Sequence, residues 1–289
     1  MSTPTNKNKV PKISMGGPSI TEGDVEAVSR VLRSGQLRGG PLCRKFEKTF
    51  ALKVGSKFAI SLSSGTVALR VACLIFLKPG DEVLVPSFTF IATASMVAHS
   101  GATPVFCDVN ARTFTLDLED AEKRITSRTR AIMPVHLFGH CCDISAVQAI
   151  ARRHNLRIVW DAAQAHGARY RGVDVGSFGD LACYSFYPTK NMTTGEGGMI
   201  TTSDSEIYEK CARMRDHGQS SANLHTSLGF NYRMTDIQAA LGLSQLKRLD
   251  SLVARRQENA GFLSEGLRDV EGITTPYIPD EAEYSYNQY

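Results

Sequence analysis

The chain has 289 residues, of which 42% are hydrophobic and 21% are charged, and its formal net charge is +4. This length exceeds that of one small domain, and the composition is typical of a soluble globular protein. The small net charge and the lack of a dense basic stripe argue against a dedicated nucleic-acid-binding protein. No stretch approaches the roughly 20 apolar residues that a membrane-spanning helix requires, so we expect no membrane segment.

The seven cysteines are scattered and form no Cys-x-x-Cys pair, which predicts neither a zinc site nor a disulfide framework. Reduced, buried thiols are typical of a cytoplasmic protein. Residues 1–12 are polar and contain several lysines. We therefore expect a disordered arm there and no secretory signal.

Two helices are predicted ahead of the first strand. Thr21 can cap the first helix and Gly35 can end it. Its apolar face consists of Val25, Val28 and Leu32. A second helix is predicted around residues 42–50.

Strands and helices then alternate along the chain. The predicted strands span residues 58–61, 82–86, 103–109, 131–137 and 156–160. The predicted helices begin near residue 66 and then span residues 91–100, 118–125 and 144–154. Strands separated by helices of about ten residues indicate βαβ units around a mostly parallel central sheet, an α/β fold.

The spacing changes after residue 161. Residues 181–186 and 198–202 are predicted as two strands, including an antiparallel pair, and residues 205–216 as a helix. From residue 235 to about 267 the pattern predicts continuous helix. The tail, residues 270–289, has the pattern of a strand that is cut short.

Lys190 lies in a run with almost no other charge, between the two later strands. An amine beside buried strands and without an adjacent carboxylate loses hydration, so we expect its pKa to fall toward neutrality. A neutral amine is a nucleophile that condenses with carbonyl groups. The alternative is a surface lysine in a glycine-rich turn, which is the usual state of an isolated lysine.

Three other stretches lie at predicted carboxyl ends of strands, where α/β sheets bind ligands. Residues 63–66 precede a helix, so they either hold a phosphate on backbone N–H groups or only cap that helix. Asp161 follows an apolar strand, and it either faces a flat ring or caps the next turn. Phe88 and Phe90 are either a stacking surface or part of the core.

Together these stretches match one ligand. A phosphate cradle, an aromatic wall, a carboxylate for a ring cation and a condensing lysine suit pyridoxal phosphate, whose aldehyde forms a Schiff base with lysine. The alternative from a different class is a nucleotide-binding α/β protein with residues 63–66 as its phosphate loop.

At these motifs the chain resembles the DegT/DnrJ/EryC1/StrS family of pyridoxal phosphate-dependent sugar aminotransferases. The resemblance runs from about residue 13 to residue 289. The matching motifs are Phe46-Glu47 and residues 64–69 (SGTVAL), 86–93 (PSFTFIAT), 134–139 (PVHLFG), 161–165 (DAAQA), 185–198 (SFYPTKNMTTGEGG) and 229–236 (GFNYRMTD).

The resemblance implies the fold of the aspartate-aminotransferase type, fold type I, with a large cofactor domain at residues 13–245. Residues 246–289 would be a linking helix and the start of a small C-terminal domain. Family members resemble this chain up to Tyr289 and then continue for roughly another 80 residues, about half a typical domain. The small domain is therefore expected to be truncated here.

The resemblance also implies which residues bind the cofactor. Lys190 would hold pyridoxal phosphate as a Schiff base, and Asp161 would contact its pyridine nitrogen. The phosphate would be held by Gly65, Thr66 and Ser185.

Four further residues take roles from the resemblance, which implies a homodimer with active sites between subunits. Phe90 would cover one face of the cofactor ring, and Gln164 would lie against the ring and its hydroxyl side. Asn231 would reach the phosphate of the partner subunit's cofactor, and Arg233 would contact substrate there. No metal is expected.

The implied reaction transfers an amino group from an amino acid, with glutamate expected, to a nucleotide-linked keto sugar in amino-sugar or polysaccharide biosynthesis. Sugar dehydratases of the same family have a histidine in place of the lysine, so Lys190 argues against that activity. Two alternatives stay open. The chain binds pyridoxal phosphate without transamination, as a sensor, a regulator or an inactive fragment, or its acceptor is a cyclitol or another ketone.

Overall fold

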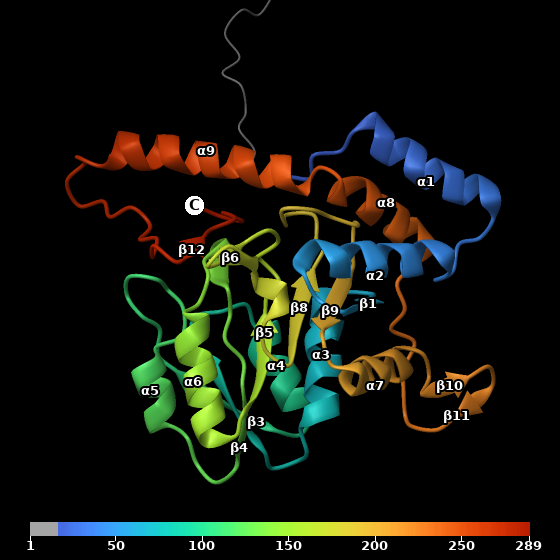
Figure 1. Ribbon diagram of the computed structural model, residues 1–289, viewed down its shortest axis with the longest axis horizontal. Helices are drawn as coiled ribbons and strands as arrows, with labels where there is room; N and C mark the ends of the chain where they lie inside the picture. Colours follow the sequence, from blue (N-terminus) through green and yellow to red (C-terminus); the bar gives the residue numbers. More distant parts are fainter. Residues whose placement is uncertain (1–16) are drawn as a thin grey trace, which may run out of the picture.

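A seven-stranded sheet forms the centre of the computed structural model, which describes residues 17–289 (Figure 1). The arm predicted for residues 1–12 lies outside the described residues. The strand order is β1 (Phe58–Leu62), β9 (Gly198–Thr202), β8 (Leu181–Ser185), β5 (Arg157–Asp161), β4 (Thr129–Ile132), β2 (Glu82–Pro86) and β3 (Thr103–Cys107). Strands β8 to β3 run parallel, whereas β9 is antiparallel to both β1 and β8. The predicted α/β fold with a mostly parallel sheet is confirmed.

Helices cover both faces of this sheet and bury an apolar layer on each. One layer includes side chains of α2 (Pro41–Val54), α5 (Leu118–Lys123) and α6 (Ile144–His154). The opposite layer includes side chains of α3 (Gly65–Phe76), α4 (Ala92–His99) and α7 (Ser205–Arg215). In β8, Ala182 and Tyr184 join the first layer while Leu181 and Cys183 join the second. This period of two is that of a strand buried on both sides.

Most predicted elements of the alternating region are present. Strand β2 and helix α6 begin and end at the predicted residues. Strand β4 ends at Ile132, five residues before the predicted end. Pro134 has no N–H group to continue the ladder, and the chain then turns into a short 3₁₀ helix, η1 (Leu137–Gly139).

The long helix predicted from residue 235 to 267 is in fact two helices, α8 (Asp236–Leu246) and α9 (Leu249–Leu267). Figure 1 shows α9 crossing above the sheet, with the C-terminus and β12 (Ala282–Glu283) beneath it. Helix α8 packs against α1 (Glu22–Ser34) and α2. The division between domains at residues 245 and 246 stays a prediction.

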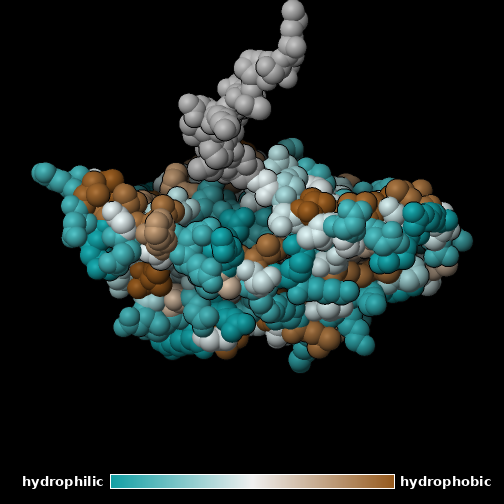
Figure 2. Space-filling view, turned by 90° about the horizontal axis from the view of Figure 1, so that it is seen from above, coloured by the Kyte–Doolittle hydropathy of each residue, from teal (hydrophilic) through white to brown (hydrophobic). Residues whose placement is uncertain are grey.

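The apolar face predicted for α1 is wrong for the single chain. Val25 and Leu32 are 47% and 55% exposed, whereas Asp24 and Val31 are buried. Figure 2 looks down on the side formed by α1, α8 and α9, where separate apolar patches interrupt a mostly hydrophilic surface. Hydropathy periodicity missed the buried face because a carboxylate lies in it.

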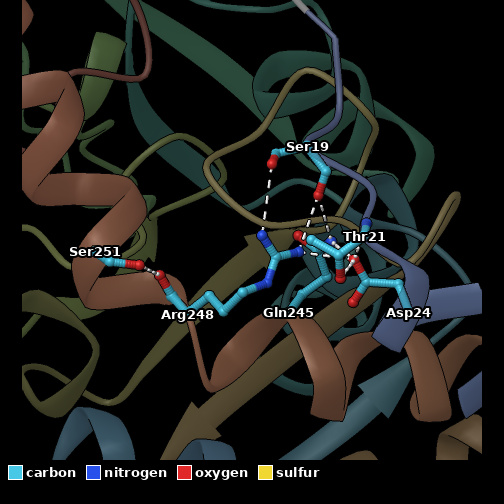
Figure 3. A network of polar contacts seen from close by, with 6 residues as sticks. All are labelled: Ser19, Thr21, Asp24, Gln245, Arg248 and Ser251. Atoms are coloured by element: carbon cyan, nitrogen blue, oxygen red, sulfur yellow. Dashed lines mark hydrogen bonds and ion pairs between the residues drawn. The ribbon is translucent and has the colours of Figure 1, made fainter.

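A polar network explains why Asp24 is buried (Figure 3). Its Oδ2 accepts hydrogen bonds from Gln245 Nε2 (3.0 Å) and Arg248 Nη2 (2.7 Å). Arg248 also donates to the carbonyl of Ser19 (2.9 Å). A buried carboxylate needs such partners, and here they fix α1 to the junction between α8 and α9.

The tail, residues 270–289, was predicted as a strand, and that prediction is wrong except at Ala282–Glu283. Strand β12 has two residues and pairs with β6 (Arg169–Tyr170), which in turn pairs with β7 (Val173–Asp174). The next backbone N–H groups bond to η1 instead of a strand: Ser285 to Gly139 O and Asn287 to Phe138 O.

Six short elements were not predicted, because segments of two or three residues show no hydropathy period. They are η1, β6, β7, the 3₁₀ helix η2 (Val175–Ser177) and the hairpin of β10 (Gln219–Ser221) with β11 (Leu224–His225). Between residues 17 and 289, none of the helices combines the length and the apolar character needed to cross a bilayer.

Candidate active site

A cavity of about 490 Å³ opens at the carboxyl ends of β5 and β8, beside the N-terminus of α3. This edge of a parallel sheet is where α/β folds bind ligands. Seven of the predicted site residues line the cavity: Gly65, Thr66, Phe90, Asp161, Gln164, Ser185 and Lys190. The fold therefore brings together chain segments that are up to 125 residues apart in sequence.

The first turn of α3 forms one end of the cavity. Ser64 caps the helix, and its hydroxyl accepts a hydrogen bond from Val67 N (3.2 Å). Gly65 and Thr66 are the first helical residues, so their N–H groups have no acceptor inside the helix. Together with the positive end of the helix dipole, these groups are suited to bind a phosphate.

Ser185, at the end of β8, lies directly against this turn. A Cβ atom built on Gly65 would be 2.5 Å from Ser185 Cβ and 3.0 Å from Ser185 Oγ. Only glycine leaves the Ser185 hydroxyl beside the backbone of α3. The two segments thus present N–H groups and a hydroxyl to the same space.

Asp161 ends β5 and is 4% exposed. Its Oδ2 accepts a hydrogen bond from Thr93 Oγ1 (2.8 Å), and its Oδ1 accepts one from Ala163 N (3.1 Å). Burial raises the pKa of Asp161, while these two hydrogen bonds and the charge of Lys190 act in the opposite direction. The carboxylate is held in a fixed orientation with lone pairs left for a ligand.

Lys190 lies in the loop between β8 and β9 and is half-buried. Its backbone N–H donates to Tyr187 O (2.9 Å), which closes a turn. Burial lowers the pKa of the Lys190 amine, and the charge of Asp161 acts in the opposite direction. The direction expected from the sequence is confirmed, and the amine is more readily deprotonated than an ordinary lysine.

The two candidate aromatic residues differ in their positions. Phe90 lines the cavity and is 66% exposed, so its ring is free to cover a flat ligand. Phe88 does not line the cavity, and its ring packs edge-on against Phe114 and Phe138. The structure thus places Phe90 on the cavity wall and Phe88 in packing contacts outside it. The spacing of the two residues in the sequence did not distinguish them.

Gln164 is oriented by the backbone of η1. Its Oε1 accepts a hydrogen bond from Phe138 N (2.6 Å). Phe138 has a left-handed backbone (φ 59°), an uncommon conformation for a bulky residue, and this turns its N–H toward the cavity wall. The side-chain NH₂ group of Gln164 is left as a donor.

Asn231 and Arg233 do not line this cavity. Both lie in the segment between α7 and α8, where Asn231 pairs with Asp216 in a backbone bridge. The guanidinium of Arg233 forms an ion pair with the same aspartate. Their predicted contribution to a neighbouring subunit's site stays a prediction.

Sequence reasoning missed four cavity or supporting residues: Thr89, Thr93, Tyr187 and Thr189. Thr93 is the last residue of the motif at residues 86–93, but no role was assigned to it because it also lies inside a predicted helix. Its distance of three residues from Phe90, within one helical turn, is the signal that could have placed it beside the site.

These residues fit pyridoxal phosphate. The glycine at position 65 opens a cradle that a Cβ would fill, and a buried carboxylate and a lysine of lowered pKa share one cavity. The fold and the site define a pyridoxal phosphate-dependent transferase of the aspartate-aminotransferase type.

Residues 18–289 match the DegT/DnrJ/EryC1/StrS aminotransferase family, and the chain belongs to that family. It is a pyridoxal phosphate-dependent aminotransferase. The family assignment excludes the alternative of a nucleotide-binding protein with residues 63–66 as its phosphate loop.

Named relatives agree with the family. The chain is 43% identical to the GDP-perosamine synthase of Caulobacter vibrioides over 274 residues, 93% of this chain and 74% of that protein. It is 43% identical to the dTDP-3-amino-3,4,6-trideoxy-alpha-D-glucose transaminase of Streptomyces venezuelae over 259 residues, 89% of this chain and 68% of that protein. The solved aminotransferase of Psychrobacter cryohalolentis superimposes with a TM-score of 0.90 at 40% identity, covering 94% of this chain and 75% of that one.

Proposed function

We propose that the protein transfers an amino group from glutamate to the carbonyl carbon of a nucleotide-linked keto sugar. The observation that carries this proposal is one cavity that joins Lys190, Asp161 and the phosphate-binding turn at Gly65. The relatives named for GDP-linked and dTDP-linked amino sugars support a nucleotide sugar as the acceptor. The product belongs to amino-sugar or polysaccharide biosynthesis.

Each residue of the cavity has a separate task. Bound pyridoxal phosphate supplies an aldehyde that takes up the amino group and a ring that withdraws electrons from the substrate. Lys190 Nζ accepts the proton from the substrate's α-carbon as a general base and later returns it as a general acid. Asp161 keeps a proton on the ring nitrogen, and the first turn of α3 with Ser185 binds the phosphate.

The half-buried position of Lys190 supports the proton-transfer role. A general base works best when its pKa lies near the working pH, and burial lowers the pKa of this amine in that direction. Phe90 would cover the ring and exclude water from one face, because it is exposed at the cavity mouth.

The second part of the proposal is a homodimer with shared active sites. Asn231 and Arg233 lie outside their own chain's cavity, which is what a contribution to a partner's site requires. Several apolar side chains near the cavity and this segment are exposed in the single chain, among them Ile91 (67%) and Leu228 (89%). Burial of such side chains favours association. We also propose a cytoplasmic location, because all seven cysteines are buried free thiols.

Half-reaction spectroscopy tests the proposal. The cofactor-loaded protein is mixed with glutamate, and the visible absorbance of lysine-bound pyridoxal phosphate should decay as 2-oxoglutarate is released. Addition of a keto sugar linked to GDP, dTDP or UDP should restore the absorbance for the true acceptor. A protein that binds the cofactor as a sensor or regulator would show no conversion, and restoration by a cyclitol ketone alone would replace the sugar acceptor.

A further inference from the structure

The tail of the chain lies against both sides of the residue that carries the reactive amine. Asn287 Nδ2 donates a hydrogen bond to Thr189 O (3.0 Å) and lies 3.5 Å from Asn191 Oδ1. Asn191 Nδ2 in turn donates to Ser285 O (2.9 Å). Residues 189 and 191, the two neighbours of Lys190, are therefore both tied to residues 285–287.

We infer that Asn287 is a positioning residue for the Lys190 amine, acting through the backbone of the Lys190 loop. The inference rests on the proposed role of Lys190. Asn287 does not line the cavity, so it takes no part in the chemistry itself. By holding residues 189 and 191, it fixes the position of the Lys190 backbone. That position determines which points in the cavity Lys190 Nζ can reach.

The side-chain amides of Asn191 and Asn287 are both buried, so their hydrogen bonds are costly to break. Asn191 is 3% exposed and Asn287 is 8% exposed. A buried amide that loses a partner bears a desolvation cost, so each side chain favours one geometry strongly over its alternatives. A satisfied buried network of this kind restricts motion more than exposed bonds do.

The tail is itself fixed to rigid elements. Arg256 Nη1, on α9, donates to the carbonyls of Tyr286 and Asn287 (3.1 Å each), and Asn287 N donates to Phe138 O (2.8 Å). Phe138 N also orients Gln164. A single short segment thus connects α9, the support of Gln164 and the Lys190 loop.

Residues 285–287 are close-packed against the backbone of η1. A Cβ on Gly139 would be 2.7 Å from Ser285 Oγ and 2.9 Å from Tyr286 N, so the tail packs directly on the glycine backbone. Because the anchor is close-packed, a change at Asn287 should be transmitted to residues 189–191 instead of being absorbed by the tail.

The test compares Asn287→Ala and Asn287→Asp with Gln288→Ala. The alanine variant removes the donor, and the aspartate variant removes it while keeping the shape of the side chain. Gln288 is the exposed neighbour and is the matched control. For the full chain loaded with pyridoxal phosphate, we expect kcat to fall about tenfold or more with little change in KM, since small misplacements of reacting groups are costly. The pH titration of the visible absorbance should also shift.

A second readout does not depend on the cofactor. Lysines of the cofactor-free protein are acetylated briefly, and mass spectrometry compares Lys190 with the exposed Lys57. We expect the relative reactivity of Lys190 to change several-fold in both Asn287 variants and not in Gln288→Ala. If Lys190 reactivity, the titration of the absorbance and kcat all match the control, the inference is overturned, even where thermal stability falls. If the unaltered protein shows no transamination but Lys190 reactivity responds to Asn287, the proposed function fails and the positioning role stands.

Discussion

Thr93 Oγ1 donates a 2.8 Å hydrogen bond to Asp161 Oδ2, and both side chains are buried. Thr89 Oγ1 lies 2.9 Å from Thr93 Oγ1 and extends this contact. Thr93 is therefore one of the few groups that oppose the rise in pKa that burial imposes on Asp161. It links helix α4 to the carboxylate that we propose faces the cofactor ring.

Replacing Thr93 with valine should raise the pKa of Asp161, because the shape is kept and the hydrogen bond to the charged form is lost. We expect the acid limb of kcat/KM against pH to move to higher pH and the affinity for pyridoxal phosphate to fall roughly tenfold, since bonds to charged groups contribute about 1.5–3 kcal/mol. Thr226→Val, at an exposed position, is the control. An unchanged acid limb would show that Thr93 does not tune Asp161.

Replacing Lys190 with alanine should abolish the visible absorbance of the bound cofactor and lower kcat by at least the 10²- to 10⁴-fold typical of a lost general base. Absorbance spectra and steady-state rates measure the two effects on the same sample. Lys57→Ala, at an exposed lysine, should leave both unchanged. Survival of both the absorbance and the turnover in Lys190→Ala would remove Lys190 from the mechanism.

Replacing Gly65 with alanine should disrupt the phosphate end of the site, because the new Cβ would be 2.5 Å from Ser185 Cβ. We expect pyridoxal phosphate affinity to fall at least tenfold and the free energy of unfolding to fall by about 1–3 kcal/mol, as in other overpacked sites. The matched variant is Gly261→Ala in α9, where no atom lies within 4 Å of the new Cβ. That substitution should be neutral or stabilise by about 0.5–1 kcal/mol. Equal effects at both positions would contradict the cradle.

Equal mixing of Lys190→Ala and Asn231→Ala chains tests the shared site. If Asn231 serves the partner subunit's cofactor, each mixed dimer has one site with both residues intact and one site with neither. Random reassociation then restores about a quarter of the normal activity, since about half of the dimers are mixed. Light scattering checks that dimers form. No recovery above the sum of the separate variants would place Asn231 within its own chain's function.

Three buried histidines should make the protein sensitive to mild acid. Burial lowers the pKa of His136 and His166 to about 3 and that of His140 to about 4. The unfolded chain takes up protons on these groups as the pH falls below about 6.5, whereas the folded chain does not, so stability is lost as the pH falls from 6.5 toward 4. Each histidine contributes up to about 1.4 kcal/mol per pH unit.

Asp174 acts in the opposite direction. Burial raises its pKa to about 6, so the folded chain takes up a proton as the pH falls through 6 and part of the loss is offset. Burial also raises the pKa of Asp161, which adds to this offset. The free energy of unfolding, measured with urea at several pH values, should therefore fall between pH 6 and 4, with a slope below the three protons that the histidines alone would give. A stability that is flat or rises toward pH 5 would contradict the buried neutral histidines.

The sequence predicted those parts of the fold that local chemistry determines. Helix α6 matched at both ends because Asp143 caps it and Asn155 ends it in a left-handed conformation. Strand β2 lies between the turn before Asp81 and the Pro86-Ser87 boundary, and its five residues are all buried. The alternation of such segments was enough to predict a mostly parallel sheet.

The parts that were missed depend on partners distant in sequence. The buried face of α1 follows from an ion pair between Asp24 and Arg248, which are 224 residues apart. The tail after residue 283 bonds to η1 because Phe138 and Gly139 present carbonyl groups there. No local pattern in either segment indicates these partners.

For the candidate site, strand ends placed Asp161 and residues 63–66 on one edge of the sheet, and the structure puts them in one cavity with Lys190. The positions of strand ends could not separate Phe90 from Phe88, which only the family resemblance did, and neither singled out Thr93. Those distinctions depend on which side of a short turn each side chain faces.

The cavity is assembled from an early part of the chain, residues 64–92, from Val135, and from a later part, residues 161–196. A nascent chain on the ribosome therefore cannot bind pyridoxal phosphate while only the first half of its residues has emerged. Strand β1 must wait for β9, more than 130 residues later, before it gains its neighbour in the sheet. The cofactor would thus bind only after residues 161–196 have been synthesised and folded. In ribosome-stalled chains of increasing length, the visible absorbance of bound cofactor should therefore appear in a single late step.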